Sequence, residues 1–403
     1  MVIDLIISLL IFVFGFLLVL SIKISKRDKR NLNLLWVYHY LFSIVNFLYL
    51  IYNGGDTLMF WKSAHDMSPT DFINILTTAY SSSQGTRIMG AINYIPVNLM
   101  GMSFFSTTIL YSIFGFIAFI FLYRICIQVI PYNSKFYKYK LFPLLFFLPN
   151  LHFWSSGPGK DTLLFLCISM VAFGFMRTYK RFLLIIFGLL LSFAIRPHVT
   201  LILLLSFGFA YVINHKISVP QRIFLVLFIA VAAALIIPSV LKFTSMDELS
   251  MDELNRFSNT QAGNLSVAGS GVDLSSYPYP LKVLTFLYRP FFFDINGIPA
   301  VVASFENLLL LLLSIKVVRS RFVTTFRAAP LVVQGLFLFF LMGALVFSMS
   351  MSNLGIILRE RNMFLPGLIL FILWSFSYKQ ELVMKKKKNI FSTLQTNKPI
   401  KPL

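Results

Sequence analysis

Long apolar segments alternate with short polar segments along the chain, and most of the polar segments are basic. A helix that spans a membrane needs about 20 mostly apolar residues, and eleven segments approach this length and composition. The eleven segments cover residues 3–22, 34–52, 104–126, 141–155, 162–176, 182–195, 199–213, 222–241, 298–315, 331–351 and 363–376. The pattern predicts an all-α fold, a polytopic transmembrane helical bundle of about 11 spans.

The composition excludes other classes of protein. Hydrophobic residues make up 58% of the chain and charged residues only 12%, which leaves too few charges to cover a water-facing surface. The 45 Phe and the long apolar runs exclude a disordered chain, and the runs do not alternate as β-barrel strands do. Cys126 and Cys167 have no His or second Cys nearby in the sequence, so we expect neither a disulfide framework nor a zinc site.

The distribution of charge predicts the orientation of the bundle. A net charge of +20 would indicate a nucleic-acid partner in a soluble protein, but the positive-inside bias of membrane proteins accounts for it here. Five basic residues at 23–30 follow the first apolar segment at once, which places the N-terminus outside. With alternating spans, the cytoplasmic segments and the tail hold 25 of the 35 Lys and Arg. We therefore predict a cytoplasmic C-terminus, a bilayer environment and no nucleic acid.

One transmembrane domain, residues 1–378, is predicted to account for most of the chain, followed by a basic cytoplasmic tail at 379–403. Two outer segments are long, at about 53–103 and 242–297. The first contains a stretch at 87–100 whose composition suits the membrane interface. Neither segment has the length or composition of a separate soluble domain.

Cationic side chains stand at four junctions between apolar segments on the predicted outer side, against the positive-inside trend. A charge at membrane depth costs about 2.5–3.5 kcal/mol on insertion scales. The residues are Lys160, Arg196, Arg289, Arg359 and Arg361. Anchoring at the lipid headgroups would explain any one of them alone. Together they would repel one another unless an anion lay among them, and phosphate or pyrophosphate suits the planar fork of Arg.

Acidic side chains and a histidine accompany these cations. Asp56 follows a pair of glycines at the end of the second apolar segment and is a candidate base at the membrane boundary. Asp161 and His198 lie beside the cations of two junctions, and a histidine can act as acid or base near neutral pH. Glu306, inside the ninth apolar segment, could serve a proton relay or pair with an Arg of a neighbouring helix. Metal-ligand spacing and nucleotide-binding glycine motifs are absent from the sequence, so no metal or cofactor is predicted.

These motifs resemble elements of bacterial integral-membrane glycosyltransferases of the glycosyltransferase C superfamily and of O-antigen-type polysaccharide polymerases. The elements are Gly55-Asp56-Thr57-Leu58-Met59-Phe60-Trp61, the turn from Trp154 to Asp161, Arg196-Pro197-His198 and Arg359-Glu360-Arg361. Superfamily members usually carry the acidic residue after the first span, whereas here it follows the second.

The resemblance implies glycosyl transfer or polymerisation at the outer face of the bacterial inner membrane, in surface polysaccharide or O-antigen synthesis. The donor would be a polyprenyl-phosphate- or polyprenyl-pyrophosphate-linked sugar, and the acceptor a glycan. Asp56 would deprotonate the acceptor hydroxyl, with Asp161, Asp294 or Glu360 as the next candidates. The substrate-binding residues would be Lys160, Asp161, Arg196, His198, Arg289, Arg359 and Arg361, with Arg196, Arg289 and Arg359 as phosphate ligands.

Two other classes of function stay open at this point. A transporter or flippase of lipid-linked glycans would use the broken helices and Glu306, although the internal repeat found in many transporters is not visible. A membrane scaffold or assembly factor would need no chemistry at all. A long outer segment that combines an acid with cations favours the enzyme.

Overall fold

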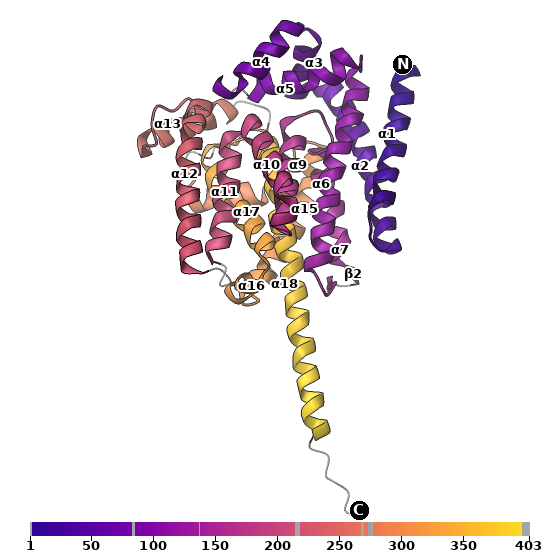
Figure 1. Cartoon of the computed structure of the whole chain (residues 1–403), viewed down its shortest axis with the longest axis vertical. Coiled ribbons are helices and arrows are strands. Elements are labelled where there is room, and N and C mark those ends of the chain that lie inside the picture. The colour runs from indigo at the N-terminus through magenta and orange to yellow at the C-terminus, as the bar shows by residue number, and fades with distance from the viewer. Residues whose placement is uncertain are drawn as a thin grey trace, which may run out of the picture.

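Helices form nearly all of the regular structure in the computed structural model, which confirms the all-α class. The structure describes residues 2–82, 85–136, 138–213, 218–266, 270–272, 274 and 277–396. Within them, strands occur in a short antiparallel hairpin of β1 (Lys135–Phe136) and β2 (Tyr139–Lys140). Figure 1 shows a bundle of helices from which one long C-terminal helix extends.

Seven helices in the described residues are long and apolar enough to cross a membrane. They are α1 (Val2–Ser21), α2 (Lys26–Asn53), α6 (Phe104–Val129), α10 (Thr178–Ile195), α12 (Val219–Thr244), α15 (Ile298–Val318) and α17 (Leu331–Ser350). A shorter apolar helix, α11 (Pro197–Ile213), lies between α10 and α12 in the chain. The chain is therefore a multi-pass helical membrane protein. The count of eleven spans and the orientation in the bilayer stay predictions.

Three further predicted spans fall outside this set, and one of them is broken. The segment at 141–155 is not one helix but three short pieces, α7 (Leu141–Leu144), η2 (Leu145–Phe147) and α8 (Pro149–Phe153). Pro143 and Pro149 lack backbone N–H donors, which explains why a continuous helix does not form. The fifth predicted span is α9 (Lys160–Phe175), and the eleventh is part of α18 (Leu354–Thr396).

Both long segments that are predicted to lie outside are largely helical. The first forms α3 (Asp56–His65), α4 (Pro69–Ser82), α5 (Gly85–Tyr94) and the π-helix η1 (Ile95–Leu99). Figure 1 shows α3, α4 and α5 together at the end of the bundle where α1 begins. The second contains α13 (Met251–Ser266), α14 (Tyr279–Tyr288) and the short η3 (Phe292–Asp294). The interfacial stretch expected at 87–100 corresponds to most of α5 and to η1.

The buried core is built around α6, α9, α17 and the first half of α18. Small residues bring these helices close together: a Cβ on Gly367 would meet the Leu336 carbonyl oxygen at 2.0 Å. Such close approach is the main source of helix association in lipid, because lipid tails are as apolar as Leu. In contrast, α12 has no buried residues, as expected of a helix that faces lipid.

The C-terminal helix extends from the bundle into the predicted tail. The basic segment predicted as a separate tail at 379–403 begins as a continuation of α18, which is 43 residues long. Residues 397–403 of that predicted tail lie outside the described residues. In Figure 1, α18 leaves the bundle at the end opposite to α3–α5, on the same side as the short helix α16 (Phe322–Ala328). The start of α1 and the far end of α18 thus lie at opposite ends of the molecule (Figure 1).

Candidate functional site

Four helix ends meet at the end of the bundle that carries α3–α5, and each brings charge. Asp56 begins α3, Asp161 lies in the first turn of α9, Arg196 directly follows α10, and Arg359 and Glu360 lie in the second turn of α18. We call these five residues the charged cluster. These residues lie far apart in the sequence, from position 56 to position 360, so the site forms only when the bundle is folded.

Glycines place the two aspartates. Gly54 and Gly55 have φ of +70° and +131°, a region that favours glycine, and they turn the chain between α2 and α3. A Cβ on Gly157 would meet the Asn46 side-chain oxygen at 2.4 Å, so the turn before α9 packs closely against α2. Asp56 and Asp161 therefore lie in the first turns of their helices, where the positive end of the helix dipole favours a carboxylate.

Arg196 and Glu360 form the buried centre of the cluster. The guanidinium donates from Nη2 to Oε1 at 2.8 Å and from Nη1 to Oε2, a bidentate pair. Arg196 Nη2 also lies 3.8 Å from Asp161 Oδ1. The Arg196 and Glu360 side chains are 9% and 5% exposed, so removal of either partner would leave an unpaired charge away from water.

Arg359 connects this centre to the surface. Its Nη1 lies 3.2 Å from Asp56 Oδ2, its Nε 3.5 Å from Asp161 Oδ2, and its Nη2 3.6 Å from Glu360 Oε1. The Asp56 side chain is 57% exposed, whereas that of Asp161 is 15% exposed. A chain of alternating charges thus leads from a buried arginine to an accessible carboxylate.

The anions expected among the outer cations are, in this structure, side chains of the protein itself. Asp56, Asp161 and Glu360 surround Arg196 and Arg359, so no added anion is needed to offset the repulsion between the two arginines. This differs from the expectation of a phosphate or pyrophosphate among the cations, because the sequence alone does not show which acidic side chains lie beside them.

Lys160 lies next to the cluster and joins two elements. Its ammonium donates to Thr86 Oγ1 at 3.1 Å and lies 5.4 Å from the centre of the Phe60 ring. Lys160 is the member of the predicted cationic set that ties α9 to the helices α3 and α5 above it.

The structure does not bring Arg289 or Arg361 into the charged cluster. Arg289 pairs with Asp294, with Nε 3.0 Å from Oδ2, five residues further along the chain. Arg361 is buried and donates to the backbone carbonyls of Phe286, Leu287 and Arg289, and to the Asn307 side chain at 2.6 Å. Both arginines therefore hold the segment around α14 in place.

His198 is enclosed by aromatic rings. Its ring centre lies 5.0 Å from that of Phe243 and 5.6 Å from that of Phe347. The imidazole Nδ1 has no hydrogen-bond partner within the described residues. His198 lies two residues after Arg196 in the chain but does not line the cavity formed by Asp56, Asp161 and Arg359.

Asp56, Asp161 and Arg359 line a cavity of about 260 Å³. The rest of its lining consists of polar and aromatic side chains and of two glycine turns: Asn46, Tyr49, Leu50, Asn53, Gly54, Gly55, Thr57, Trp154, Gly157, Gly159 and Thr162. Three buried polar atoms of this lining make no hydrogen bond within the described residues, namely Asn46 Oδ1, Trp154 Nε1 and Asp161 Oδ1. Convergent polar groups of this kind suit a ligand rich in hydroxyl groups.

Sequence reasoning missed the contribution of α2. Asn46 lies inside the second apolar segment and is only 5% exposed, yet it contacts the turn before α9 through Nδ2, which donates to the Phe153 carbonyl at 3.1 Å. A polar residue inside an apolar segment is costly unless it has a partner. That cost was a usable signal, and the same signal marks the buried pair of His39 and His152.

Glu306 has a partner of a kind that the sequence did not suggest. It accepts hydrogen bonds from the backbone N–H of Asn150, at 2.9 Å, and from the Asn150 side chain. These bonds connect α15 to the first turn of α8. In the described residues, Glu306 therefore serves to join two helices rather than to pair directly with an arginine.

The described residues hold no group of three or more His, Cys, Asp and Glu side chains arranged to hold a metal ion. The three carboxylates of the charged cluster each face a guanidinium group, which competes with a cation for the same oxygens. The cavity is thus better suited to a ligand that carries an anionic group and hydroxyl groups than to a metal ion.

The resemblance to glycosyltransferases expected from the sequence rests only on the short motifs around Asp56, Asp161, Arg196 and Arg359. No protein-family model, curated protein or solved structure matches the chain.

Proposed function

We propose that the chain is a glycosyltransferase or polysaccharide polymerase, embedded in the bacterial inner membrane, that uses a polyprenyl-phosphate- or polyprenyl-pyrophosphate-linked sugar at the outer face. The observation that carries the proposal is the cavity in which the exposed carboxylate of Asp56 lies 3.2 Å from Arg359. Transfer to a hydroxyl acceptor needs a base for the hydroxyl proton and a cation for the departing phosphate.

In the proposed reaction, Asp56 accepts the proton of the acceptor hydroxyl. The oxygen so activated attacks the anomeric carbon of the donor sugar, and the bond from that carbon to the carrier phosphate breaks. Arg359 stabilises the charge that develops on the leaving phosphate. The indole of Trp154 and the amide of Asn46, which both line the cavity, supply apolar and polar contacts for the sugar ring.

The roles of the cations follow from how strongly each is engaged. Arg359 donates one hydrogen bond, to Asp56 at 3.2 Å, and lies 3.5 Å and 3.6 Å from Asp161 and Glu360, beyond ordinary hydrogen-bond distance, so a phosphate group can compete for it. Lys160 precedes Asp161 in the chain and donates to Thr86, and it is a second ligand candidate. Arg196 is already bound in bidentate fashion by Glu360 and acts as a positioning residue. Arg289 is likewise held by Asp294.

Substitution of Asp56 by Asn tests the proposed base, since Asn keeps the size of the side chain and removes its basicity. We expect glycan extension to fall by about 10²- to 10⁴-fold in cells that lack the native gene. Asp66→Asn is a matched control, because Asp66 lies on the same outer segment and its side chain is 79% exposed. Membrane levels of each variant are compared by immunoblot.

Wild-type chain length from a well-expressed Asp56→Asn variant would remove Asp56 from the mechanism. The base would then be sought at Asp161, which lines the same cavity, because Glu360 and Asp294 are both held in bidentate pairs. A flippase of lipid-linked glycans would give a different result. In cells that lack the gene the donor would fail to cross the membrane, and the purified protein would transfer no sugar.

A further inference from the structure

A second group of cations lies at the opposite end of α9 from Asp161. Arg177, Lys180 and Arg181 occupy the turn into α10 and its first residues, and Arg124 lies near the end of α6. We call these four residues the basic cluster. Unlike the charged cluster, it includes no ion pair with a carboxylate anywhere in the described part of the chain.

Two members of the basic cluster are fixed on one aromatic ring. The guanidinium carbons of Arg124 and Arg181 lie 4.6 Å and 3.7 Å from the centre of the Phe173 ring, which is buried. Arg181 Nη1 also donates to the Phe173 carbonyl at 2.9 Å. Arginines that only reach for headgroups would extend freely from the helix ends. Here the two guanidinium groups are instead held against one aromatic ring, which keeps two positive charges near each other at this end of α9.

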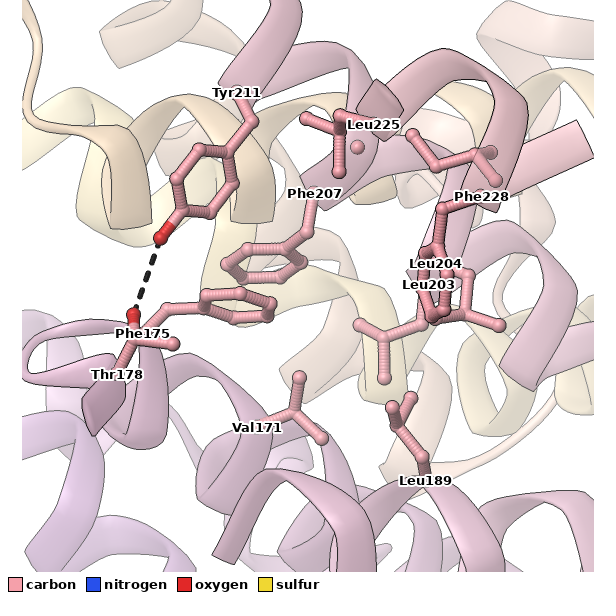
Figure 2. A pocket seen from close by; sticks show the side chains of 12 residues that line it. Val171, Phe175, Thr178, Leu189, Leu203, Leu204, Phe207, Tyr211, Leu225 and Phe228 are labelled. Carbon is pink, nitrogen blue, oxygen red and sulfur yellow. Dashed lines mark hydrogen bonds between the residues drawn. The ribbon is translucent and has the colours of Figure 1, made fainter. Parts of the chain in front are cut away.

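An apolar pocket of about 260 Å³ adjoins this turn (Figure 2). Phe175 and Phe207 stack in its wall with ring centres 4.5 Å apart, and the Thr178 and Tyr211 hydroxyls lie 3.1 Å apart. Phe175 and Thr178 flank Arg177 in the sequence, so the basic cluster and the pocket share one segment. Residues of α9, α10, α11 and α12 line the pocket. They are Val171, Phe175, Thr178, Leu189, Leu203, Leu204, Phe207, Gly208, Tyr211, Leu225, Phe228 and Ile229.

We propose that the basic cluster and this pocket together bind one anionic phospholipid. The phosphate lies against Arg177 and Arg181, and an acyl chain enters the apolar pocket between α9, α11 and α12. Charge selects the occupant: four cations without a carboxylate favour a headgroup of net negative charge over a zwitterionic one that carries its own ammonium. The apolar lining requires an acyl chain, which a free phosphate lacks. Basic pockets between helices on the cytoplasmic side are suited to acidic lipid headgroups.

Native mass spectrometry of the full chain in detergent micelles tests the proposal, with phosphatidylglycerol, phosphatidylcholine and inorganic phosphate offered separately. We expect phosphatidylglycerol alone to be retained as a single adduct. The double variant R177Q/R181Q should bind it roughly 10- to 30-fold more weakly, from the contribution of two surface cations. The matched control R27Q/R30Q removes two exposed arginines at the start of α2 and should bind as the wild type does.

Leu204→Phe tests the apolar half of the site, because it fills the pocket and leaves the four cations unchanged. We expect it to weaken retention of long-chain phosphatidylglycerol and to spare binding of a short-chain analogue. Equal retention of phosphatidylglycerol and phosphatidylcholine, or equal losses in R177Q/R181Q and in the control, would overturn the proposal. Because the two variants change different parts of the site, misfolding of one leaves the other as the test. The readout is lipid binding, so the result is independent of the proposed glycosyl transfer.

Discussion

Arg196 and Glu360 show what it takes to keep two charges inside this bundle. Each side chain satisfies the other in a bidentate pair, and Asp161 and Arg359 extend the network toward the cavity. A buried pair of this kind adds little net stability compared with two apolar residues, but loss of one partner is severe. The pair fixes the end of α10 against α18 and so sets where Arg359 can lie.

Replacement of Arg196 by Leu removes the bidentate partner of Glu360 and leaves this buried carboxylate only the more distant Arg359, at 3.6 Å. We expect the free energy of unfolding to fall by about 3–5 kcal/mol. The double variant R196M/E360M, which removes both charges, should recover most of this loss. Thermal unfolding in detergent measures both; if R196L is as stable as the wild type, Glu360 is not buried in the way described.

The hydrogen-bond partners of the buried imidazoles of His39 and His152 determine which ring nitrogen of each carries the proton. His152 Nε2 lies 2.7 Å from the Phe146 carbonyl oxygen and must donate to it. The His152 Nδ1 is then an acceptor in the neutral ring, so His39 Nδ1 donates to it at 3.0 Å. The pair joins α2 to α8 behind the cavity.

His152→Phe should therefore destabilise the protein by about 1–3 kcal/mol, because the His39 N–H loses its acceptor in an apolar setting. The double variant H39F/H152F removes donor and acceptor together and should unfold at a temperature closer to that of the wild type. An equal or larger loss in the double variant would mean that packing, rather than the hydrogen bond, dominates at this position.

At the level of elements, the site depends on how closely the turn before α9 packs against α2. Gly157 and Gly159 lie in the same turn but face different surroundings. A Cβ at Gly157 would lie 2.4 Å from Asn46 Oδ1, whereas one at Gly159 would meet only Thr57 Oγ1, at 3.6 Å. The turn thus contains one position that requires glycine and one that has room for a methyl group.

Gly157→Ala should push the turn away from α2, move Asp161 and reduce glycan extension, with a loss of stability of about 1–3 kcal/mol. Gly159→Ala is the matched control and should change either quantity little. The two variants are compared by glycan extension and by thermal unfolding. Equal behaviour of the two would show that the contact with Asn46 does not position Asp161.

Which elements the sequence could predict depends on how each is stabilised. Long uninterrupted apolar runs such as those of α1, α6 and α17 correspond to long helices because backbone hydrogen bonding in lipid leaves few alternatives. The segment at 141–155 has the same composition, but its prolines break it. The pairing of Asp56 with Arg359 lies beyond sequence reasoning, since 303 positions separate them and only the folded bundle brings them together.

At the scale of the whole molecule, the two ends of the bundle differ in how charge is balanced. At the end that carries α3–α5, carboxylates lie among the cations, whereas the basic cluster at the other end has none among the described residues. In the predicted orientation, the unbalanced cations would face the cytoplasm and its anionic lipids. The length of α9 separates the proposed catalytic site from the proposed lipid site.

Reporter fusions test this orientation directly. Fusions after Lys29 and after Lys388 should both report a cytoplasmic position. Starting from an outer N-terminus, Lys29 follows the first span and Lys388 follows the last of an odd number of spans. A fusion within α4 should report the outer side, where the charged cluster would meet its substrates. An outer signal at Lys29 or Lys388 would invert the map and place Asp56 on the wrong side for a lipid-linked donor.

The most direct test of the proposed function is the rate of sugar transfer by purified protein in proteoliposomes, from a polyprenyl-phosphate-linked donor to a glycan acceptor. Measured under single-turnover conditions, the rate reports the chemical step rather than product release. We expect transfer by the wild type and by Asp66→Asn at similar rates, and a rate about 10²- to 10⁴-fold lower for Asp56→Asn. Transfer by Asp56→Asn at the rate of the wild type, or no transfer by any form of the protein, would contradict the assignment of Asp56 as the base of a glycosyltransferase.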